Sequence, residues 1–259
     1  MANKWTKRLK KLGIFQSLSR EAGLAPALKW LVFSALKIEK PLFVQVRGVA
    51  VEMRTAGSDA NVILDSLCGE FDEVVAEIST AKHGLIVDGG GYIGTAAIIF
   101  AKQYPEATIV TIEPSAANFA LLQKNVAAYP NIVPMNRALD SKPGVLRMYD
   151  HGTGAWGFSA IKPKNTDEGG VLNEIECITI PDILAETGKQ GIDILKVDIE
   201  GGELSLLSGD LAWLDSTDAM VIELHDRIVS GCTEAYEAAT SGRENRAMKG
   251  EKFLSLRTG

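Results

Sequence analysis

The chain has 259 residues, enough for one ordinary α/β domain with an attachment and too few for two full-size domains. Apolar residues make up 46% and charged residues 23%, with 25 glycines and 9 prolines, which excludes disordered, collagen-like and disulfide-scaffold chains. No apolar run approaches the roughly 18 residues that a membrane span needs. Three widely spaced cysteines form no disulfide framework, so a cytoplasmic location is expected.

The net charge of −6 is unevenly distributed along the chain. Residues 1–40 carry nine basic and two acidic side chains, a local charge of +7, which leaves −13 for residues 41–259. Apolar residues recur at helical spacing among these cations and predict a basic helical N-terminal extension, with Gly13, Gly23 and Pro26 separating two helices. Such a segment caps the domain, docks on a partner or makes peripheral contact with an anionic membrane surface.

Residues 41–84 are expected to form the entry to the core. The stretch 42–54 alternates apolar and polar residues around Gly48, which predicts a hairpin, and 72–80 is a predicted helix. From residue 85 onward, short apolar runs that end in an acid or a glycine alternate with helical stretches. The predicted strands are 85–88, 108–113, 132–138, 194–198 and 219–225, and the predicted helices between them are 92–103, 116–128, 180–187 and 203–207.

This alternation predicts an α/β fold with a Rossmann-like, doubly wound and mostly parallel sheet, because strands buried on both faces need helices on either side. After a predicted helix at 233–239, the strands 245–249 and 252–257 are joined by a turn at Gly250. They predict a C-terminal antiparallel hairpin that completes a seven-stranded sheet. Residues 85–259 are therefore expected to form the ligand-binding core.

The first core strand runs into the glycine-rich segment VDGGGYIG, residues 87–94, directly before a helix. Glycines let the backbone turn tightly and approach a ligand closely. From Gly89 the segment matches G-x-G-x-x-G, and Glu113 lies 19 residues after Gly94, about where an acid would hold a ribose. Taken alone, this pattern fits either a dinucleotide or S-adenosylmethionine.

Asp88 favours S-adenosylmethionine. A dinucleotide would place a doubly charged pyrophosphate beside this carboxylate, whereas S-adenosylmethionine brings a sulfonium and an ammonium group. Asp88, Gly90 and Gly94 then form the cofactor loop, and Glu113 would accept hydrogen bonds from both ribose hydroxyls. The alternatives are that Asp88 stabilises a helix N-terminus and that Glu113 is a solvated strand end. Asp140, after the third strand, either contacts the adenine amino group or opens an Asx turn.

Acidic residues gather after the fourth strand in DILKVDIEGGE, residues 193–203. Asp198 and Glu200 are predicted to be functional, and Glu203 is read mainly as a first-turn acid of the next helix. The fifth strand ends in IELH, where His225 points to the same edge and is a candidate general base for a substrate hydroxyl. No spacing here is diagnostic of a metal, so none is predicted, although carboxylates of this edge would suit Mg²⁺.

These motifs resemble those of the FkbM-type S-adenosylmethionine-dependent methyltransferases. The similarity rests on VDGGGYIG, TIEPSAANFALLQKN, ILKVDIEGGE, IELH and GEKFLSL and covers about residues 42–257. It implies the class I methyltransferase fold and methyl transfer to a hydroxyl oxygen of a sugar, glycan or natural-product acceptor. The family usually has Asn where this chain has Tyr92, which we assign to the cofactor site with the rest of its loop.

Two other functions fit parts of the sequence. A nicotinamide-dependent oxidoreductase would use the G-x-G-x-x-G pattern, and a non-catalytic binding module would use the same fold without turnover. The acidic body carries no basic stripe, so nucleic acid is not an expected partner. The loop of residues 150–170, with Trp156 and Phe158, is expected to determine the acceptor, either as a lid or by packing on the domain.

Overall fold

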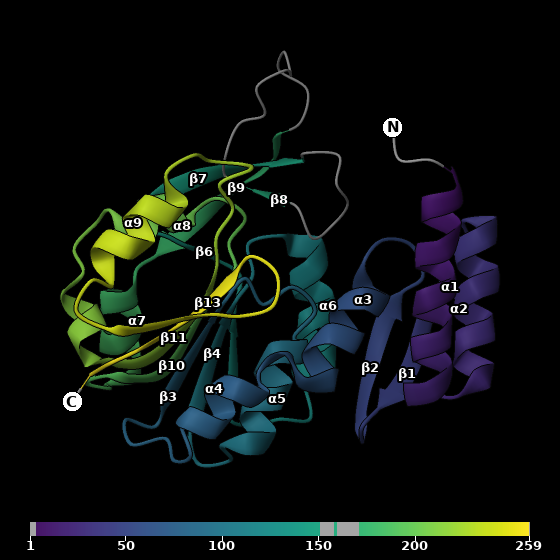
Figure 1. Ribbon diagram of the computed structural model, residues 1–259, viewed down its shortest axis with the longest axis horizontal. Coiled ribbons are helices and arrows are strands. Elements are labelled where there is room, and N and C mark those ends of the chain that lie inside the picture. Colours follow the sequence, from purple (N-terminus) through teal and green to yellow (C-terminus); the bar gives the residue numbers. More distant parts are fainter. Residues whose placement is uncertain (1–3, 151–157, 160–170, 259) are drawn as a thin grey trace.

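The computed structural model describes residues 4–150, 158–159 and 171–258, so Trp156 and most of the loop around it lie outside the description. Its centre is one seven-stranded sheet (Figure 1). In spatial order the strands are β12 (Glu244–Ala247), β13 (Lys252–Leu256), β11 (Thr217–Glu223), β10 (Ile192–Val197), β3 (Leu85–Gly89), β4 (Thr108–Ile112) and β5 (Ile132–Met135).

The five strands from β11 to β5 are parallel, and β13 pairs antiparallel with β11 and with β12. The predicted mostly parallel sheet with its closing hairpin is thus confirmed. The strand order reverses between β3 and β10, the place where open α/β sheets bind ligands at the carboxyl ends of their strands.

Helices cover both faces of the sheet because successive strand residues point to opposite sides. Ile86 packs into the apolar cluster on the face of α5 (Thr95–Gln103) and α6 (Ala116–Val126). Leu85 and Val87 pack into a second cluster with α7 (Ile180–Thr187), α8 (Glu203–Leu207), α9 (Cys232–Ala239) and the 3₁₀ turn Ala212–Ser216. The predicted helix 92–103 begins only at Thr95, because Tyr92 and Gly94 have positive φ angles.

A second sheet was not predicted. It contains β6 (Ala138–Leu139), β9 (Val171–Ile178), β7 (Val145–Asp150) and β8 (Phe158–Ser159), in that order. The predicted strand 132–138 was too long. It ends at Met135, and Ala138 pairs instead with Cys177 of β9.

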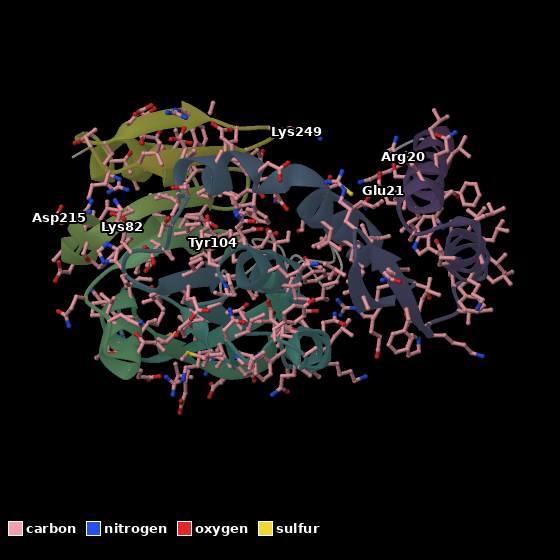
Figure 2. All side chains as sticks on the ribbon, turned by 90° about the horizontal axis from the view of Figure 1, so that it is seen from below. Arg20, Glu21, Lys82, Tyr104, Asp215 and Lys249 are labelled. Carbon is pink, nitrogen blue, oxygen red and sulfur yellow. The ribbon has the colours of Figure 1, made fainter. Side chains whose placement is uncertain are left out.

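The N-terminal extension is a pair of helices, α1 (Lys4–Glu21) and α2 (Leu24–Leu36), which lies beside the hairpin of β1 (Pro41–Val46) and β2 (Val49–Arg54) (Figure 1). Gly13 does not break α1 as expected; the break comes at Gly23, whose φ is 92°. Glu21, labelled in Figure 2, lies 3.6 Å from the guanidinium of Arg47 in the hairpin turn. None of the described helices is long and apolar enough to cross a membrane.

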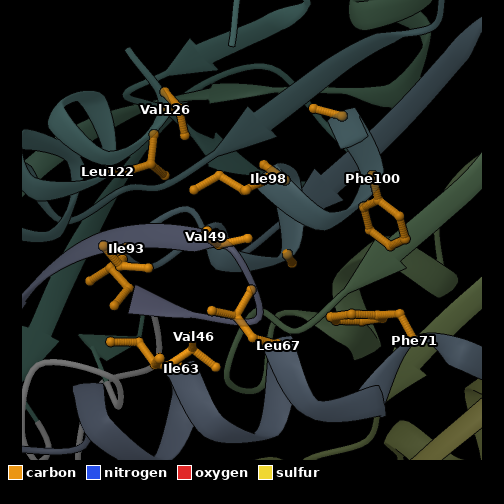
Figure 3. Packing of buried hydrophobic residues seen from close by; sticks show 14 of the residues in the cluster. Val46, Val49, Ile63, Leu67, Phe71, Ile93, Ile98, Phe100, Leu122 and Val126 are labelled. Carbon is orange, nitrogen blue, oxygen red and sulfur yellow. The ribbon is translucent and has the colours of Figure 1, made fainter. Parts of the chain in front are cut away.

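Between the hairpin and the sheet lie α3 (Asp59–Asp65), a π-helical turn (Ser66–Glu70) and α4 (Asp72–Glu77), of which the sequence predicted only the last. Their apolar side chains join the hairpin to α5 and α6 (Figure 3). Phe71 and Phe100 pack with ring centroids 5.1 Å apart. The same core includes Trp30 of α2, so the expected segments 1–40, 41–84 and 85–259 share one apolar cluster.

Candidate active site

A cavity of about 440 Å³ lies at the carboxyl ends of β3, β4, β10 and β11. This volume is within the range of about 300–1,000 Å³ that is usual for small-molecule sites. Its lining includes Gly90, Glu113 and Asp140 as well as Asp198 and Glu200. Residues 58–71, from α3 and the π-helical turn, contribute a wall of Ser58, Val62, Asp65, Ser66, Glu70 and Phe71 that the sequence did not reveal.

The glycine loop packs directly against the neighbouring strands. A Cβ atom on Gly90 would lie 1.8 Å from the backbone oxygen of Asp198, and the φ of Gly90 is +83°. A Cβ on Gly91 would lie 2.2 Å from Oγ1 of Thr111. Glycine is therefore required here both by conformation and by space. The loop backbone forms the floor of the cavity at the end of β3.

Asp88 lies beneath this loop rather than at its mouth. Its side chain has no exposed surface, and its Oδ2 accepts a hydrogen bond from the Thr111 hydroxyl at 2.8 Å. The Nζ of Lys196, which is next to Asp88 in the sheet register, lies 3.2 Å from Oδ1 and donates to the Gly90 oxygen at 2.6 Å. Asp88 thus fixes Lys196 and the loop, and it is Lys196 that lines the cavity.

Glu113 directly follows β4 and lines the cavity, and both of its carboxylate oxygens accept hydrogen bonds. Oε2 accepts from the backbone N–H of Tyr92 at 2.9 Å, and Oε1 accepts from the N–H of Ser115 and the amide of Asn118. Burial raises the pKa of Glu113 to about 7, although these hydrogen bonds favour the charged form. Of about four acceptor positions on a carboxylate, three are used by the protein.

Tyr92 connects the loop to the newly found wall. Its hydroxyl donates to Asp59 of α3, which also binds the guanidinium of Arg54 at 2.9 Å. Arg54 lies over the Tyr92 ring, 5.2 Å from its centroid, and donates to Asn118 at 2.8 Å. Burial raises the pKa of Tyr92. Tyr92 therefore holds one side of the cavity through its side chain and reaches Glu113 only through its backbone.

Asp140 lines the cavity near β6. Its Oδ1 accepts from the Ser141 N–H and from the Ser205 hydroxyl, both at 2.6 Å, so it ties its loop to α8. An Asx turn, the alternative reading of Asp140, requires a hydrogen bond from the backbone N–H two residues further on. Asp140 instead accepts from the N–H of the next residue, so this Asx turn does not form. The adenine contact remains a prediction.

Four ionisable side chains meet at the ends of β10 and β11. The Nε2 of His225 lies 3.8 Å from Asp198 Oδ1, 3.7 Å from Glu200 Oε2 and 3.6 Å from Glu223 Oε1. The three carboxylates line the cavity, whereas His225 is fully buried behind them. His225, Asp198 and Glu200 thus lie close together, as the sequence predicted.

Glu203 is a structural acid, as its place in the first turn of α8 suggested, but it does more than favour the helix N-terminus. Its carboxylate accepts from the backbone N–H groups of Ile199 and Gly201, at 3.0 and 2.9 Å. Its Oε1 also lies 2.9 Å from Nδ1 of His225. Glu203 therefore closes the turn around Glu200, whose φ is +51°, and orients the imidazole.

The electrostatics of this cluster follow from burial among carboxylates. Burial raises the pKa of Asp198, and it raises the pKa of Glu200 to about 7. Burial alone would lower the pKa of His225, but the hydrogen bond to Glu203 and the surrounding carboxylates raise it to about 10. Burial would likewise raise the pKa of Glu223, but His225 and Lys252 lower it to about 2.

Two lysines at the site were also missed, for different reasons. Lys196 precedes Asp198 by two positions and so shares its side of β10, a signal that period-two spacing contains. Lys252, from the C-terminal hairpin, binds Glu223 at 2.9 Å and Glu70 of the π-helical turn at 2.6 Å. Nothing local in the sequence predicts that meeting, because it depends on the packing of three distant segments.

The reversing strand order, the closing hairpin and the glycine loop at the switch point together define the class I methyltransferase fold. A model of the methyltransferase FkbM domain matches residues 88–241, more than half of the chain. The chain belongs to this family and is a methyltransferase, and the expected dependence on S-adenosylmethionine is consistent with that membership.

Curated relatives include the hexuronic acid methyltransferase AglP of Haloferax volcanii, 26% identical over 200 residues, 76% of this chain and 79% of the relative. Methyltransferase sdnD of Sordaria araneosa is 27% identical over 158 residues, 49% of this chain and 61% of the relative, so the match spans less than two thirds of sdnD. An O-methyltransferase from Bacillus cereus, solved in complex with SAH, is 14% identical with a TM-score of 0.43, covering 73% of this chain and 80% of that one.

Proposed function

We propose that the protein transfers a methyl group from S-adenosylmethionine to a hydroxyl oxygen of a sugar, glycan or related natural-product acceptor. The observation that carries the proposal is one continuous cavity lined by Gly90 and Glu113 and also by Asp198 and Glu200. The relative AglP is named for an acidic sugar, which favours a carbohydrate acceptor.

The cofactor end is assigned to the glycine loop with Glu113 and Asp140. When bound, S-adenosylmethionine supplies an electrophilic methyl group on a cationic sulfur. Glu113 has one acceptor position left for a ribose hydroxyl, and a second such bond requires Asn118 or Tyr92 to shift. Lys196, paired with Asp88, would hold the loop in its binding shape.

The acceptor end is assigned to Asp198 and Glu200, whose carboxylates line the cavity. In the reaction the acceptor oxygen forms a bond to the methyl carbon, the carbon–sulfur bond breaks with its electron pair going to sulfur, and the hydroxyl proton moves to a carboxylate. Alignment of the two reactants and removal of this proton are the contributions that the chain can make. Because His225 has no exposed surface, we assign it a positioning role.

Incubation with labelled S-adenosylmethionine and a panel of sugar and uronic acid acceptors tests this function. We expect label in an alkali-stable methyl ether, found by mass spectrometry, and cofactor binding by calorimetry. Binding of NAD(H) without S-adenosylmethionine would support the oxidoreductase instead. Cofactor binding with no transfer to any acceptor in a cell extract would support a non-catalytic module.

We also propose that α1 and α2 contact an anionic membrane surface. Six apolar side chains on this pair are between 45% and 65% exposed, namely Leu9, Leu12, Leu24, Leu28, Val32 and Leu36. Exposed cations lie among them, namely Lys10, Arg20, Lys29, Lys37 and Lys40. The pair is nonetheless docked on the hairpin through Ala27 and Trp30. Apolar side chains mixed with cations match the interface of an anionic bilayer.

A further inference from the structure

The imidazole of His225 has one nitrogen satisfied and one not. Nδ1 lies 2.9 Å from Glu203, whereas Nε2 is fully buried and has no hydrogen-bond partner among the described residues. Nε2 points at oxygens of Asp198, Glu200 and Glu223, 3.6 to 3.8 Å away, which is beyond hydrogen-bond distance. A buried polar atom without a hydrogen-bond partner indicates that a proton, a water molecule or an ion lies between it and the carboxylates.

The surroundings of Nε2 carry an excess of negative charge. Among the described residues, seven carboxylates lie in the connected network of ion pairs around it, namely Glu70, Asp88, Asp198, Glu200, Glu203, Glu223 and Glu251. Three permanent cations of the described part of the chain oppose them, namely Lys196, Arg227 and Lys252. With every carboxyl ionised and the imidazole neutral, seven against three leaves four negative charges in this part of the described structure. Such an excess attracts a cation of more than one charge.

We infer that this cluster binds a divalent transition-metal ion, with His225, Asp198 and Glu200 as ligands. One ligand atom from each lies within 4.8 Å of the other two. Bonds of about 2.1 Å to one ion place neighbouring ligand atoms about 3.0–3.5 Å apart, so small movements of the carboxylates would complete the site. Glu223, paired with Lys252, has its Oε1 3.6 Å from Nε2 and would approach the same ion from the side of β11.

The ligand set decides which ion fits. Mg²⁺ prefers oxygen ligands and keeps much of its water, whereas imidazole nitrogen suits Fe²⁺ or Zn²⁺ and the carboxylates of a mixed set also suit Mn²⁺. The hydrogen bond from Nδ1 to Glu203 is the outer partner that a metal-binding histidine usually has. Coordination would replace a proton on Nε2 as the positive charge there.

The position of the site gives the ion a task that rests on the proposed methyl transfer. Its carboxylate ligands line the cavity and His225 lies behind them, so an ion held by these three residues would be open toward the cavity. A dication there would polarise an acceptor hydroxyl and favour loss of its proton. A carboxylate that binds the ion through one oxygen keeps the other oxygen to receive that proton.

A second histidine and carboxylate cluster provides the control. His83, Asp193 and Asp218 also lie close enough to share an ion. However, the two oxygens of Asp193 already accept the backbone N–H groups of His83 and Leu85, and Asp218 is paired with Arg257 at 2.6 Å. These carboxylates are committed to the protein, and the cluster does not line the cavity.

The test is titration of the full chain, stripped with EDTA and dialysed, with Mn²⁺ followed by electron paramagnetic resonance. We expect one bound ion per chain and, in the spin-echo spectrum, coupling to an imidazole nitrogen. Asp198→Asn and His225→Gln should weaken binding at least about tenfold, and His225→Gln should remove the nitrogen coupling. His83→Gln, the matched control, should leave affinity and coupling unchanged.

Circular dichroism of each variant distinguishes loss of the metal site from loss of the fold. If His225→Gln does not fold, the Mn²⁺ affinity of Asp198→Asn tests the inference. Absence of Mn²⁺ binding, binding that survives in both site variants, or a spectrum without nitrogen coupling would overturn the inference. Calorimetry with S-adenosylmethionine on the same samples tests the methyltransferase proposal separately. An imidazolium in place of the ion predicts no Mn²⁺ binding at all.

Discussion

At the scale of single residues, the site depends on carboxylates that look alike in sequence and differ in what surrounds them. Asp88 is buried against Lys196 and stabilises the loop, while Asp198 lies two residues beyond Lys196 and reaches the cavity. The carboxylate of Glu203 is hydrogen-bonded to two backbone N–H groups and to His225. Spacing predicted where these acids gather, but only the packing around each one shows which can face a ligand.

Glu113 gives the residue-scale prediction. Because its folded pKa of about 7 exceeds the ordinary 4.5, the fold loses stability as pH rises between these values and Glu113 ionises. Ribose hydroxyls favour the carboxylate, so S-adenosylmethionine should bind more tightly as pH rises from about 6 to about 8. Glu113→Gln should bind about 10- to 100-fold more weakly at pH about 8 and lose this pH dependence.

Calorimetry across the pH range measures both effects. Glu106→Gln is the matched control, because Glu106 is exposed and lies outside the cavity. A pH dependence that persists unchanged in Glu113→Gln would assign it to another group. Unchanged affinity in that variant would remove Glu113 from the cofactor site.

At the scale of elements, regular βα alternation was predicted well and irregular segments were not. The strands β3, β4, β10 and β11 were found because each is a short apolar run that ends in an acid or glycine. The alternation in residues 174–177 of β9 is a short strand signal, but β6, one of its two neighbours, has two residues and gives none. The π-helical turn contains Gly69 at φ 116° and has no periodic pattern to detect.

The glycine loop gives the element-scale prediction. Gly90→Ala places a methyl group against the backbone oxygen of Asp198 at a φ of +83°, so β3 and β10 must separate at their ends. We expect a loss of at least about 2 kcal/mol in the free energy of unfolding. Cofactor affinity should fall as well, because the loop forms the floor of the cavity.

Urea unfolding checks this, with Gly242→Ala as the control. Gly242 has no atom within 4 Å of an added Cβ, so that variant should unfold within about 0.5 kcal/mol of the wild type. Equal stability of the two variants would mean that the loop does not lie as closely against β10 as the structure has it.

At the scale of the whole molecule, the uneven charge has a structural counterpart. The cation-rich helix pair lies at one end of the molecule, on the far side of the hairpin from the seven-stranded sheet (Figure 1). The acidic cavity lies at the carboxyl ends of β3, β4, β10 and β11. The two parts still share one core through Ala27 and Trp30. A membrane contact made by α1 and α2 would therefore hold the cavity at a fixed distance from the bilayer, where a lipid-linked acceptor could be presented.

Flotation with vesicles of phosphatidylcholine alone or with phosphatidylserine measures this contact. We expect the full chain to float with the anionic vesicles and to be released by salt, because the cations supply about 1 kcal/mol each near such a surface. Val32→Glu should abolish flotation, since it puts a charge on the exposed apolar surface of α2. Val145→Glu, the same change at an exposed valine of β7, should float like the wild type.

Flotation that is unaffected by Val32→Glu, or that is equally strong on neutral vesicles, would contradict the membrane contact. Cofactor affinity should be unchanged in Val32→Glu, because α2 does not line the cavity.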